Sequence, residues 1–286
     1  MSGNILSAVL LVPLLIIPGC RRSEQHWKVI PASFVYSIVQ RDDSLYISTR
    51  SGETFRMHPD NPDAITRTGL RHFFPLRTLR FLSDGTLIAG SYEGGVYRVH
   101  SDTLTLLPGA MRPSWSMCTD NSNRIWLAGK QGIFILADDT LIRFSDLHEA
   151  YDVEFHRGHL AVAHRHGITL YDTSNANAVR TYGRDTIFWS LDRFDSLLVC
   201  GGVESCLLIS DTIPTAIHVG PPGNIPWAAA MDAYGTIFLG TQQGLYSVTI
   251  NSRNARRIGY AGKCIKSVLV DRKGRLWVGE YFNRQR

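Results

Sequence analysis

Helical periodicity, charge and cysteine are all scarce in this chain. Charged residues make up 19% of it and five residues are cysteine. The scarcity of helical signals predicts an all-β protein. Cys and His residues do not stand at the spacing of a zinc site, so we expect no metal and no other cofactor. The formal net charge of +5 contains no run of Lys or Arg, which argues against nucleic acid as a partner.

In place of helical signals, the chain repeats one phrase with a period of about 40 residues. Each copy has a short apolar strand, a polar turn, a second apolar strand that ends in a small residue, and a turn into a third strand. The turn before the second strand recurs every 35 to 41 residues, which is typical of propeller blades. The copies are 34–57, 76–99, 114–136, 151–171, 187–209, 226–248 and, cut short, 264–286.

A single copy could not be stable alone. Residues 124–129 (RIWLAG) read as a strand that is apolar on both faces. Sheets stacked around an axis cover both faces of each other. A fourth strand is expected after each third one, at 103–107, 141–144, 179–182, 216–219 and 255–259. We therefore predict a seven-bladed β-propeller with four-stranded antiparallel blades over residues 34–286.

The last copy ends soon after its second strand. Residues 27–30 (WKVI) form a spare strand before the first copy. We expect this N-terminal strand to pair with the last blade and close the ring, because closure removes exposed sheet edges. One strand of the last blade still has no candidate, so either the blade is incomplete or the reading frame is truncated.

The N-terminus carries an uncharged stretch of Leu, Ile and Val over residues 5–17, which ends at Pro18-Gly19-Cys20. Its length suits the apolar region of a signal peptide and is short for a membrane span. A small residue before Cys resembles a lipoprotein signal, which predicts a lipid on Cys20.

This interpretation divides the chain into a signal peptide over 1–19, a tether with the closing strand over 20–33, and the propeller. It predicts a lipid-anchored protein of the bacterial cell envelope, in the periplasm or on the outer membrane. Arg21 and Arg22 leave open a reversed anchor with the propeller in the cytoplasm.

Several copies resemble the two-component regulator propeller repeat. Residues 232–246 (DAYGTIFLGTQQGLY) and 268–279 (VLVDRKGRLWVG) follow its order of Asp, turn, Gly, apolar, Trp, apolar, Gly, Thr and Gly-Leu-Tyr. In that family the repeats form the extracytoplasmic ligand-sensing part of membrane-spanning histidine kinases. No later membrane segment, kinase core or DNA-binding domain is expected in this chain. The resemblance therefore implies a sensor-like propeller without its own transmitter.

The Asp-x-x-Gly turns also resemble, more weakly, the Asp-box repeats of sialidase-like propellers. The Ser or Thr that such a box has two residues before its Asp is replaced by Ala230 and Leu269. WD-type repeats are less similar, because no Gly-His or Trp-Asp pair ends the copies.

The candidate ligand site is the mouth of the central channel, where the inner strands begin. Alignment on the second strand gives Arg77, Trp115, Trp227 and Lys266 the same position. Aromatic rings among cations and amides suit sugars, and the two cations would attract a carboxylate or sulfate. Packing between blades is the alternative role for the two tryptophans. The predicted ligand-binding set is Tyr36, Arg77, Trp115, Tyr151, Trp189, Trp227, Lys266, His164 and His166.

His164 and His166 stand two residues apart, so on an extended strand they would point the same way and offer two metal ligands. They occupy a hairpin position that holds Gln242 and Gln243 in another copy. We favour turn residues over a metal site. Cys200 and Cys206 flank one hairpin, which leaves a disulfide between them open.

The sequence shows no catalytic constellation. Glu93, Asp152, Glu204 and Glu280 are carboxylates near the mouth, but the local pattern pairs none of them with another functional group. We expect a non-catalytic protein that binds a glycan or another small polar ligand. The alternatives are a propeller glycoside hydrolase or lyase, and an envelope scaffold that binds a protein partner.

Overall fold

The computed structural model describes residues 8–12, 28–31, 34–71, 74–100, 103–107, 114–137, 140–203, 205–210 and 214–281. Every regular element in this part of the chain is a β-strand, which confirms the all-β prediction. Within the described ranges, no helix is long and apolar enough to cross a membrane. Cys20, Trp27 and Glu204 lie outside the described residues.

The strands form four-stranded antiparallel sets that follow one another along the chain. The first has β3 (Val35–Arg41), β4 (Ser44–Thr49), β5 (Glu53–His58) and β6 (Asn61–Arg71). The second has β7 (Leu76–Phe81), β8 (Leu87–Ser91), β9 (Gly95–Val99) and β10 (Leu104–Leu106). The third has β11 (Ser116–Thr119), β12 (Ile125–Gly129), β13 (Gly132–Ala137) and β14 (Thr140–Ser145). The fourth has β15 (Ala150–His156), β16 (His159–His164), β17 (Gly167–Asp172) and β18 (Ala178–Tyr182).

The fifth set has β19 (Phe188–Phe194), β20 (Leu197–Gly202), β21 (Cys206–Ile209) and β22 (Thr215–Val219). The sixth has β23 (Pro226–Met231), β24 (Thr236–Thr241), β25 (Gly244–Thr249) and β26 (Asn254–Gly259). A short parallel pairing of β22 with β26 joins these two sets into one eight-stranded sheet. The last set has β27 (Cys264–Val270), β28 (Leu276–Tyr281), β1 (Ala8–Val12) and β2 (Lys28–Pro31).

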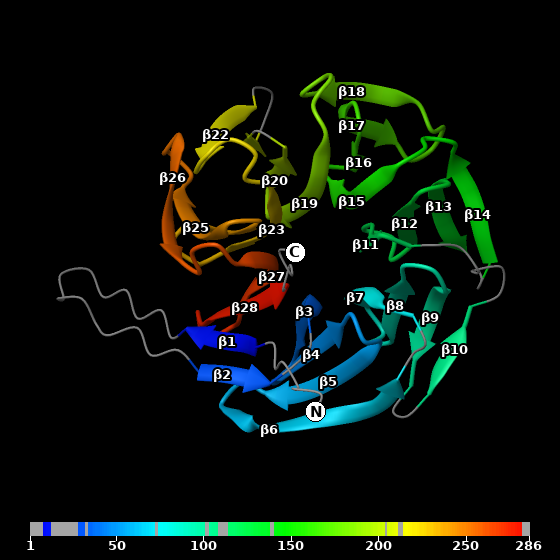
Figure 1. Cartoon of the computed structure of the whole chain (residues 1–286). Helices are drawn as coiled ribbons and strands as arrows, with labels where there is room; N and C mark the ends of the chain where they lie inside the picture. The colour runs from blue at the N-terminus through cyan, green and yellow to red at the C-terminus, as the bar shows by residue number, and fades with distance from the viewer. Residues whose placement is uncertain are drawn as a thin grey trace, which may run out of the picture.

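The sets stand side by side around a common centre, with the first strand of each nearest to it (Figure 1). Each inner strand contacts the inner strand of the next set, from β3 through β7, β11, β15, β19 and β23 to β27, and β27 contacts β3. This radial arrangement is that of a β-propeller. The fourth strands expected from the sequence are present as β10, β14, β18, β22 and β26.

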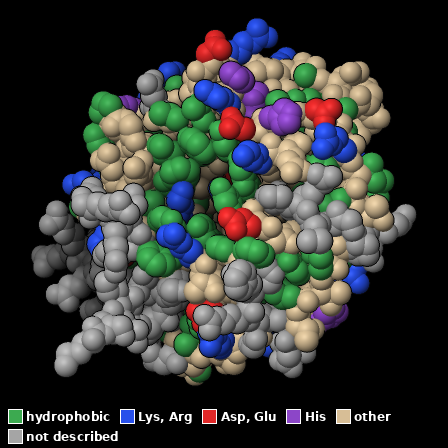
Figure 2. Space-filling view, turned by 45° about the vertical axis from the view of Figure 1, so that its right-hand side comes forward, with side chains coloured by type: hydrophobic (Ala, Val, Ile, Leu, Met, Phe, Trp, Pro, Cys, Tyr) green, Lys and Arg blue, Asp and Glu red, His purple; other side chains and the backbone are tan. Residues whose placement is uncertain are grey.

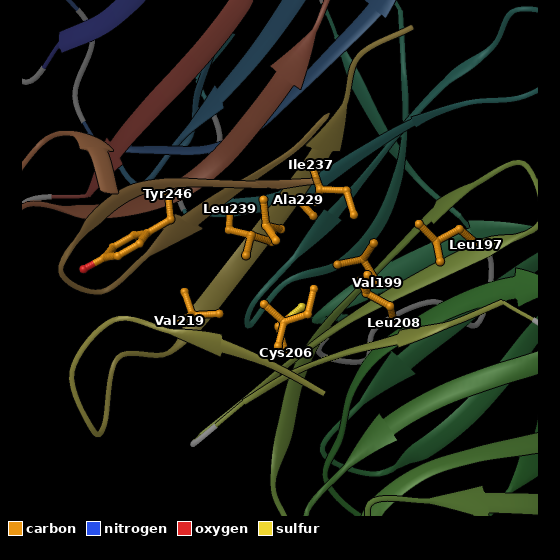
Figure 3. Packing of buried hydrophobic residues seen from close by; sticks show 11 residues of the cluster. Leu197, Val199, Cys206, Leu208, Val219, Ala229, Ile237, Leu239 and Tyr246 are labelled. Carbon is orange, nitrogen blue, oxygen red and sulfur yellow. The ribbon is translucent and has the colours of Figure 1, made fainter. Parts of the chain in front are cut away.

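Apolar side chains fill the space between neighbouring sets. Between the fifth and sixth sets, Val199, Cys206 and Leu208 pack with Ala229 and Leu239 (Figure 3). Each strand thus covers its neighbour's face, as its two-sided apolar sequence requires. Cys200 packs in a different cluster, on the other face of its sheet. Both cysteines are free, so the hairpin carries no disulfide.

The last set contains both N-terminal strands. The expected closing strand is present as β2, but β2 pairs with β1, and β1 pairs with β28. In Figure 1, the blue β1 lies beside the red β28. Residues 8–12 therefore supply the strand for which the sequence offered no candidate. They also lie within the predicted signal peptide, so two roles are assigned to the same residues.

Two of the Asp turns, at Asp271 and at Asp120, each contain a buried hydrogen-bond cluster of the same kind. Asp271 Oδ2 accepts from Arg275 Nε at 2.6 Å and Trp277 Nε1 at 2.9 Å, while its Oδ1 accepts two backbone N–H groups of the turn. Asp120 binds Arg124 and Trp126 in the same way. This cluster fixes the turn to the strand behind it, because one carboxylate satisfies donors from both.

The third such turn keeps only half of the cluster. Asp232 Oδ1 accepts the backbone N–H groups of Tyr234 and Thr236, but its buried Oδ2 has no partner. Thr236 and Phe238 stand where the other two copies have Arg and Trp, so this turn lacks the guanidinium and indole donors that bind Oδ2 in the other two.

Candidate functional site

The candidate site begins with a β-bulge at the start of the inner strands. In six sets the pairing of the first two strands shifts by one residue, so one residue lies opposite no partner. A bulge re-aims the side chain of the extra residue. The extra residues are Tyr36, Arg77, Tyr151, Trp189, Trp227 and Lys266. In the third set Trp115 directly precedes β11, and its backbone N–H donates to the backbone oxygen of Ala128 at 2.8 Å.

These bulge residues line one cavity of about 330 Å³ among the inner strands. The structure thus gives equivalent places to seven of the nine residues predicted as ligand-binding. Alignment of the copies on their second strands alone places Tyr36 and Tyr151 one residue later than Arg77, and Trp189 two residues later, because the register of the bulge is not visible in the sequence. Tyr281, the last residue of β28, also lines the cavity and was missed, since the equivalent positions of other sets hold the small residues Thr49, Ser91 and Thr241.

Four of the lining residues form an aromatic arc. The rings of Trp115 and Tyr151 stack with centroids 5.5 Å apart and planes at 7°. The Tyr151 and Trp189 centroids are 4.2 Å apart, and those of Trp189 and Trp227 are 5.6 Å apart. Figure 2 shows hydrophobic side chains in green gathered on one face of the molecule, with a few charged side chains among them. Such an arc offers flat apolar surface to a ligand.

Two cations, Lys266 and Arg77, lie at the two ends of the aromatic arc. Lys266 Nζ lies 2.9 Å from the Trp227 ring centroid and 5.8 Å from that of Tyr281. The Arg77 guanidinium lies 5.9 Å from the Trp115 ring centroid. Tyr36 lies between the two cations, and its ring centroid is 5.8 Å from that of Tyr281. We call these seven bulge-position residues and Tyr281 the collar.

The cations of the collar are poorly solvated. Burial lowers the pKa of Lys266 to about 7, and the positive charge of Arg77 acts in the same direction. Burial also lowers the pKa of Arg77. Burial and the neighbouring Tyr281 raise the pKa of Tyr36 to about 12. Within the part of the chain that the structure describes, neither cation has a carboxylate at ion-pair distance. Each cation therefore loses hydration without gaining a counter-ion.

Acidic residues lie further along the inner strands, below the collar. Asp152 Oδ2 accepts the Leu191 N–H at 2.7 Å, and Asp192 Oδ2 accepts the Ala229 N–H at 2.8 Å. Burial raises the pKa of Asp152 to about 6 and raises that of Asp192 well above its usual range. These hydrogen bonds tie each inner strand to the next one, which gives both carboxylates a structural role.

An ion pair joins the second and fourth sets beside the cavity. Arg80 Nη2 lies 2.9 Å from Glu154 Oε2, and Arg80 Nε donates to Met117 O at 2.9 Å. Arg80 thereby links β7 to β11 and β15. The sequence pattern singled out neither Arg80 nor Asp192, because their partners Glu154 and Ala229 lie on other sheets.

His164 and His166 do not line the cavity. His164 is buried in its own sheet, where Nε2 lies 2.9 Å from Thr169 Oγ1 and Nδ1 accepts the His166 N–H at 3.2 Å. Both ring nitrogens of His164 are therefore engaged. His164 is the last residue of β16, and only His166 lies in the turn that follows. Across the described ranges, no group of three or more His, Cys, Asp or Glu side chains is placed to hold a metal.

Comparison with known proteins identifies relatives by structure only. No protein-family model matches the sequence, and no curated protein is recognisably similar to it. The extracellular domain of a hybrid two-component system from B. thetaiotaomicron superposes with a TM-score of 0.73 at 15% identity over 87% of this chain. The match covers 37% of that protein, so this chain spans well under half of its length.

Two other solved structures match over almost their whole length. Streptogramin B lyase superposes with a TM-score of 0.73 at 12% identity, covering 96% of this chain and 95% of the lyase. The WD40 propeller domain of Doa1 superposes with a TM-score of 0.71 at 13% identity, covering 96% and 93%. At these identities the matches establish a shared fold, and the chain is accordingly a β-propeller of the architecture found in an extracellular sensor domain.

Proposed function

We propose that this protein is a sensor-like propeller that binds a glycan or another small polar ligand at the collar and does not transform it. The observation that carries the proposal is the collar itself, in which equivalent positions of the repeat present aromatic rings and cations to one cavity. The fold is similar to an extracellular sensor domain, and the repeat resembles the two-component regulator propeller. We propose on these two grounds that the chain belongs to that repeat family.

The collar requires a closed ring of seven blades, which we also propose. Support comes from a core cluster in which Val35 and Ile47 of the first set pack with Trp277 of the last. Closure through β1 and β2 would satisfy the free edge of β28. A closed ring holds the collar residues at fixed separations, which favours a preformed site.

The carboxylates near the collar favour binding over catalysis. An acid or base must reach the reacting atoms, but Asp152 and Asp192 each accept a backbone N–H from the next inner strand. Glu154 is held by Arg80. A glycoside hydrolase or lyase remains the second candidate, because the Asp152 and Asp192 carboxylates line the cavity. An envelope scaffold is the third candidate.

Tryptophan fluorescence tests these candidates. Adding the bound oligosaccharide should change the emission of the collar tryptophans, and Trp227→Ala should weaken binding at least about tenfold through loss of stacking area. Tyr234→Ala is the matched control, because Tyr234 is 84% exposed on a turn and does not line the cavity. Release of reducing ends would identify an enzyme instead. Unchanged fluorescence with all sugars, together with one stoichiometric protein captured from envelope extract, would identify a scaffold.

We further propose that Cys20 is lipidated and that the chain is anchored in the cell envelope, outside the cytoplasm. A removed signal peptide over 1–19 would take β1 with it, and β28 would lose its present neighbour. β1 runs antiparallel to both β28 and β2, so β2 runs parallel to β28. It would have to reverse direction to replace β1 in an antiparallel blade.

Intact-mass measurement of the protein from the membrane fraction decides between these uses of residues 8–12. The expected result is a chain that begins at Cys20 and carries the added mass of the lipid, and Cys20→Ser should accumulate the uncleaved form. A chain that retains residues 8–12 and carries no lipid would contradict the anchor and would leave β1 in the sheet.

A further inference from the structure

The collar holds hydrogen-bond donors that have no acceptor. Trp189 Nε1 and Trp227 Nε1 are buried and unpartnered, and both belong to residues that line the cavity. Arg77 and Lys266 face the same cavity without a counter-ion among the described residues. Buried donors without acceptors are costly, so a cavity that holds two of them beside two cations without a counter-ion is suited to a ligand rich in acceptor oxygens.

Arg77 and Lys266 line the same part of the cavity wall. Arg77 and Lys266 come from the second and last sets, on either side of Tyr36 in the first. They are close enough that the charge of Arg77 lowers the pKa of Lys266. Two like charges in a poorly hydrated cavity repel each other, and an anion between them would relieve both the repulsion and the loss of hydration.

The cations also decide the sign of the ligand's charge. An aromatic ring of this kind could in principle enclose an ammonium group through cation–π contacts. In the collar, the Trp227 and Trp115 faces are already approached by Lys266 and Arg77. An incoming cation would have to displace them against like-charge repulsion, whereas an anion would be attracted.

We infer that the collar binds an oxyanion-bearing sugar, with its carboxylate, sulfate or phosphate group between Arg77 and Lys266 and its ring on the arc from Trp115 to Trp227. This inference names the ligand class for the proposed function and rests on it. Asp152 and Asp192 below the collar also line the cavity, and their oxygens can accept hydroxyl donors. The ligand is thereby oriented, with its anion at the mouth and its hydroxyls toward the channel.

The experiment uses four probes that differ at one carbon: glucose, glucuronate, glucose 6-sulfate and glucose 6-phosphate. Each is titrated by calorimetry into the full-length protein at low and at high salt. We expect at least one anionic sugar to bind about tenfold more tightly than glucose at low salt and to lose part of this preference at high salt. The best of the three identifies the oxyanion, and a preference for phosphate or sulfate over glucuronate distinguishes those sources.

Single variants Arg77→Met and Lys266→Met should each reduce the preference for the anionic probe over glucose by about tenfold. Arg77→Lys should restore part of it. Lys273→Met is the matched control, because Lys273 is exposed and pairs with Asp60 outside the cavity. Thermal unfolding of each variant confirms that the fold is retained.

Two results would overturn the inference, and they differ in what they say of the proposed function. Equal affinity for glucose and all three anionic probes, with binding still lost in Trp227→Ala, refutes the anion site and leaves the glycan-binding proposal standing. If no probe binds, and if Trp227→Ala does not change the fluorescence response to oligosaccharides, both the anion site and the glycan-binding proposal are refuted. An anion preference that survives loss of both cations also refutes the assignment to Arg77 and Lys266.

Discussion

Replacing Asp271 with alanine is expected to lower the free energy of unfolding by about 3 to 5 kcal/mol. The carboxylate is fully buried and holds Trp277 Nε1, Arg275 Nε and two backbone N–H groups. Its removal leaves the indole N–H of the fully buried Trp277 and two backbone N–H groups of the turn without acceptors. Urea unfolding followed by circular dichroism measures the loss as a shift of the midpoint at constant slope.

The chain supplies its own control for this prediction. Asp232→Ala removes the same carboxylate from a turn where only Oδ1 is engaged. We expect a smaller loss there, about 1 to 2 kcal/mol, because no indole or guanidinium depends on it. Equal losses in the two variants would show that the backbone bonds of the turn carry the effect and that the Arg and Trp partners add little.

Gly201→Ala is expected to cost about 3 kcal/mol, although alanine is the smallest possible change. A Cβ on Gly201 would overlap with the backbone carbonyl oxygen of Pro226 and with Ser190 Oγ. Pro226 opens β23, the inner strand of the next set, so relief requires β20 and β23 to move apart. The expected observation is a lower urea midpoint, with changed emission from neighbouring Trp227.

The matched control is the corresponding position of the third set. Ala128 pairs with Ser116 as Gly201 pairs with Ser190, and its methyl group is accommodated there. Ala128→Gly should cost no more than about 1 kcal/mol, chiefly through chain entropy. A Gly201→Ala variant as stable as the unchanged protein would mean that the neighbouring sheet shifts at little cost, contrary to the close packing of β20 against β23.

Repetition made the fold predictable from sequence. The strand at 124–129 is apolar on both faces, so it needed sheets on both sides, and the period required several such sheets. The same repetition located Arg77, Trp115, Trp227 and Lys266 at one structural level. The expected fourth strands were correct because each follows a hairpin whose apolar face would otherwise be uncovered.

Register and long-range pairing were not predictable in the same way. The alignment misplaced Tyr36 and Trp189 by one or two residues, since a bulge adds a residue without changing the apolar pattern. The alignment also placed His164 at the mouth. In the structure, hydrogen bonds to Thr169 and His166 hold the His164 side chain within its own sheet. The pairing of β1 with β28 joins segments from opposite ends of the chain, and no local signal records it.

By itself, the amino-acid sequence determined that this chain consists of repeated two-sided apolar sheets, because the spacing of apolar residues and turns is a local property. The tertiary structure alone decided that Arg77 and Lys266 share a cavity without a counter-ion among the described residues, and that Arg80 pairs with Glu154 two sets away. Those contacts join residues on different sheets, and their distances depend on how the sheets are placed around the axis.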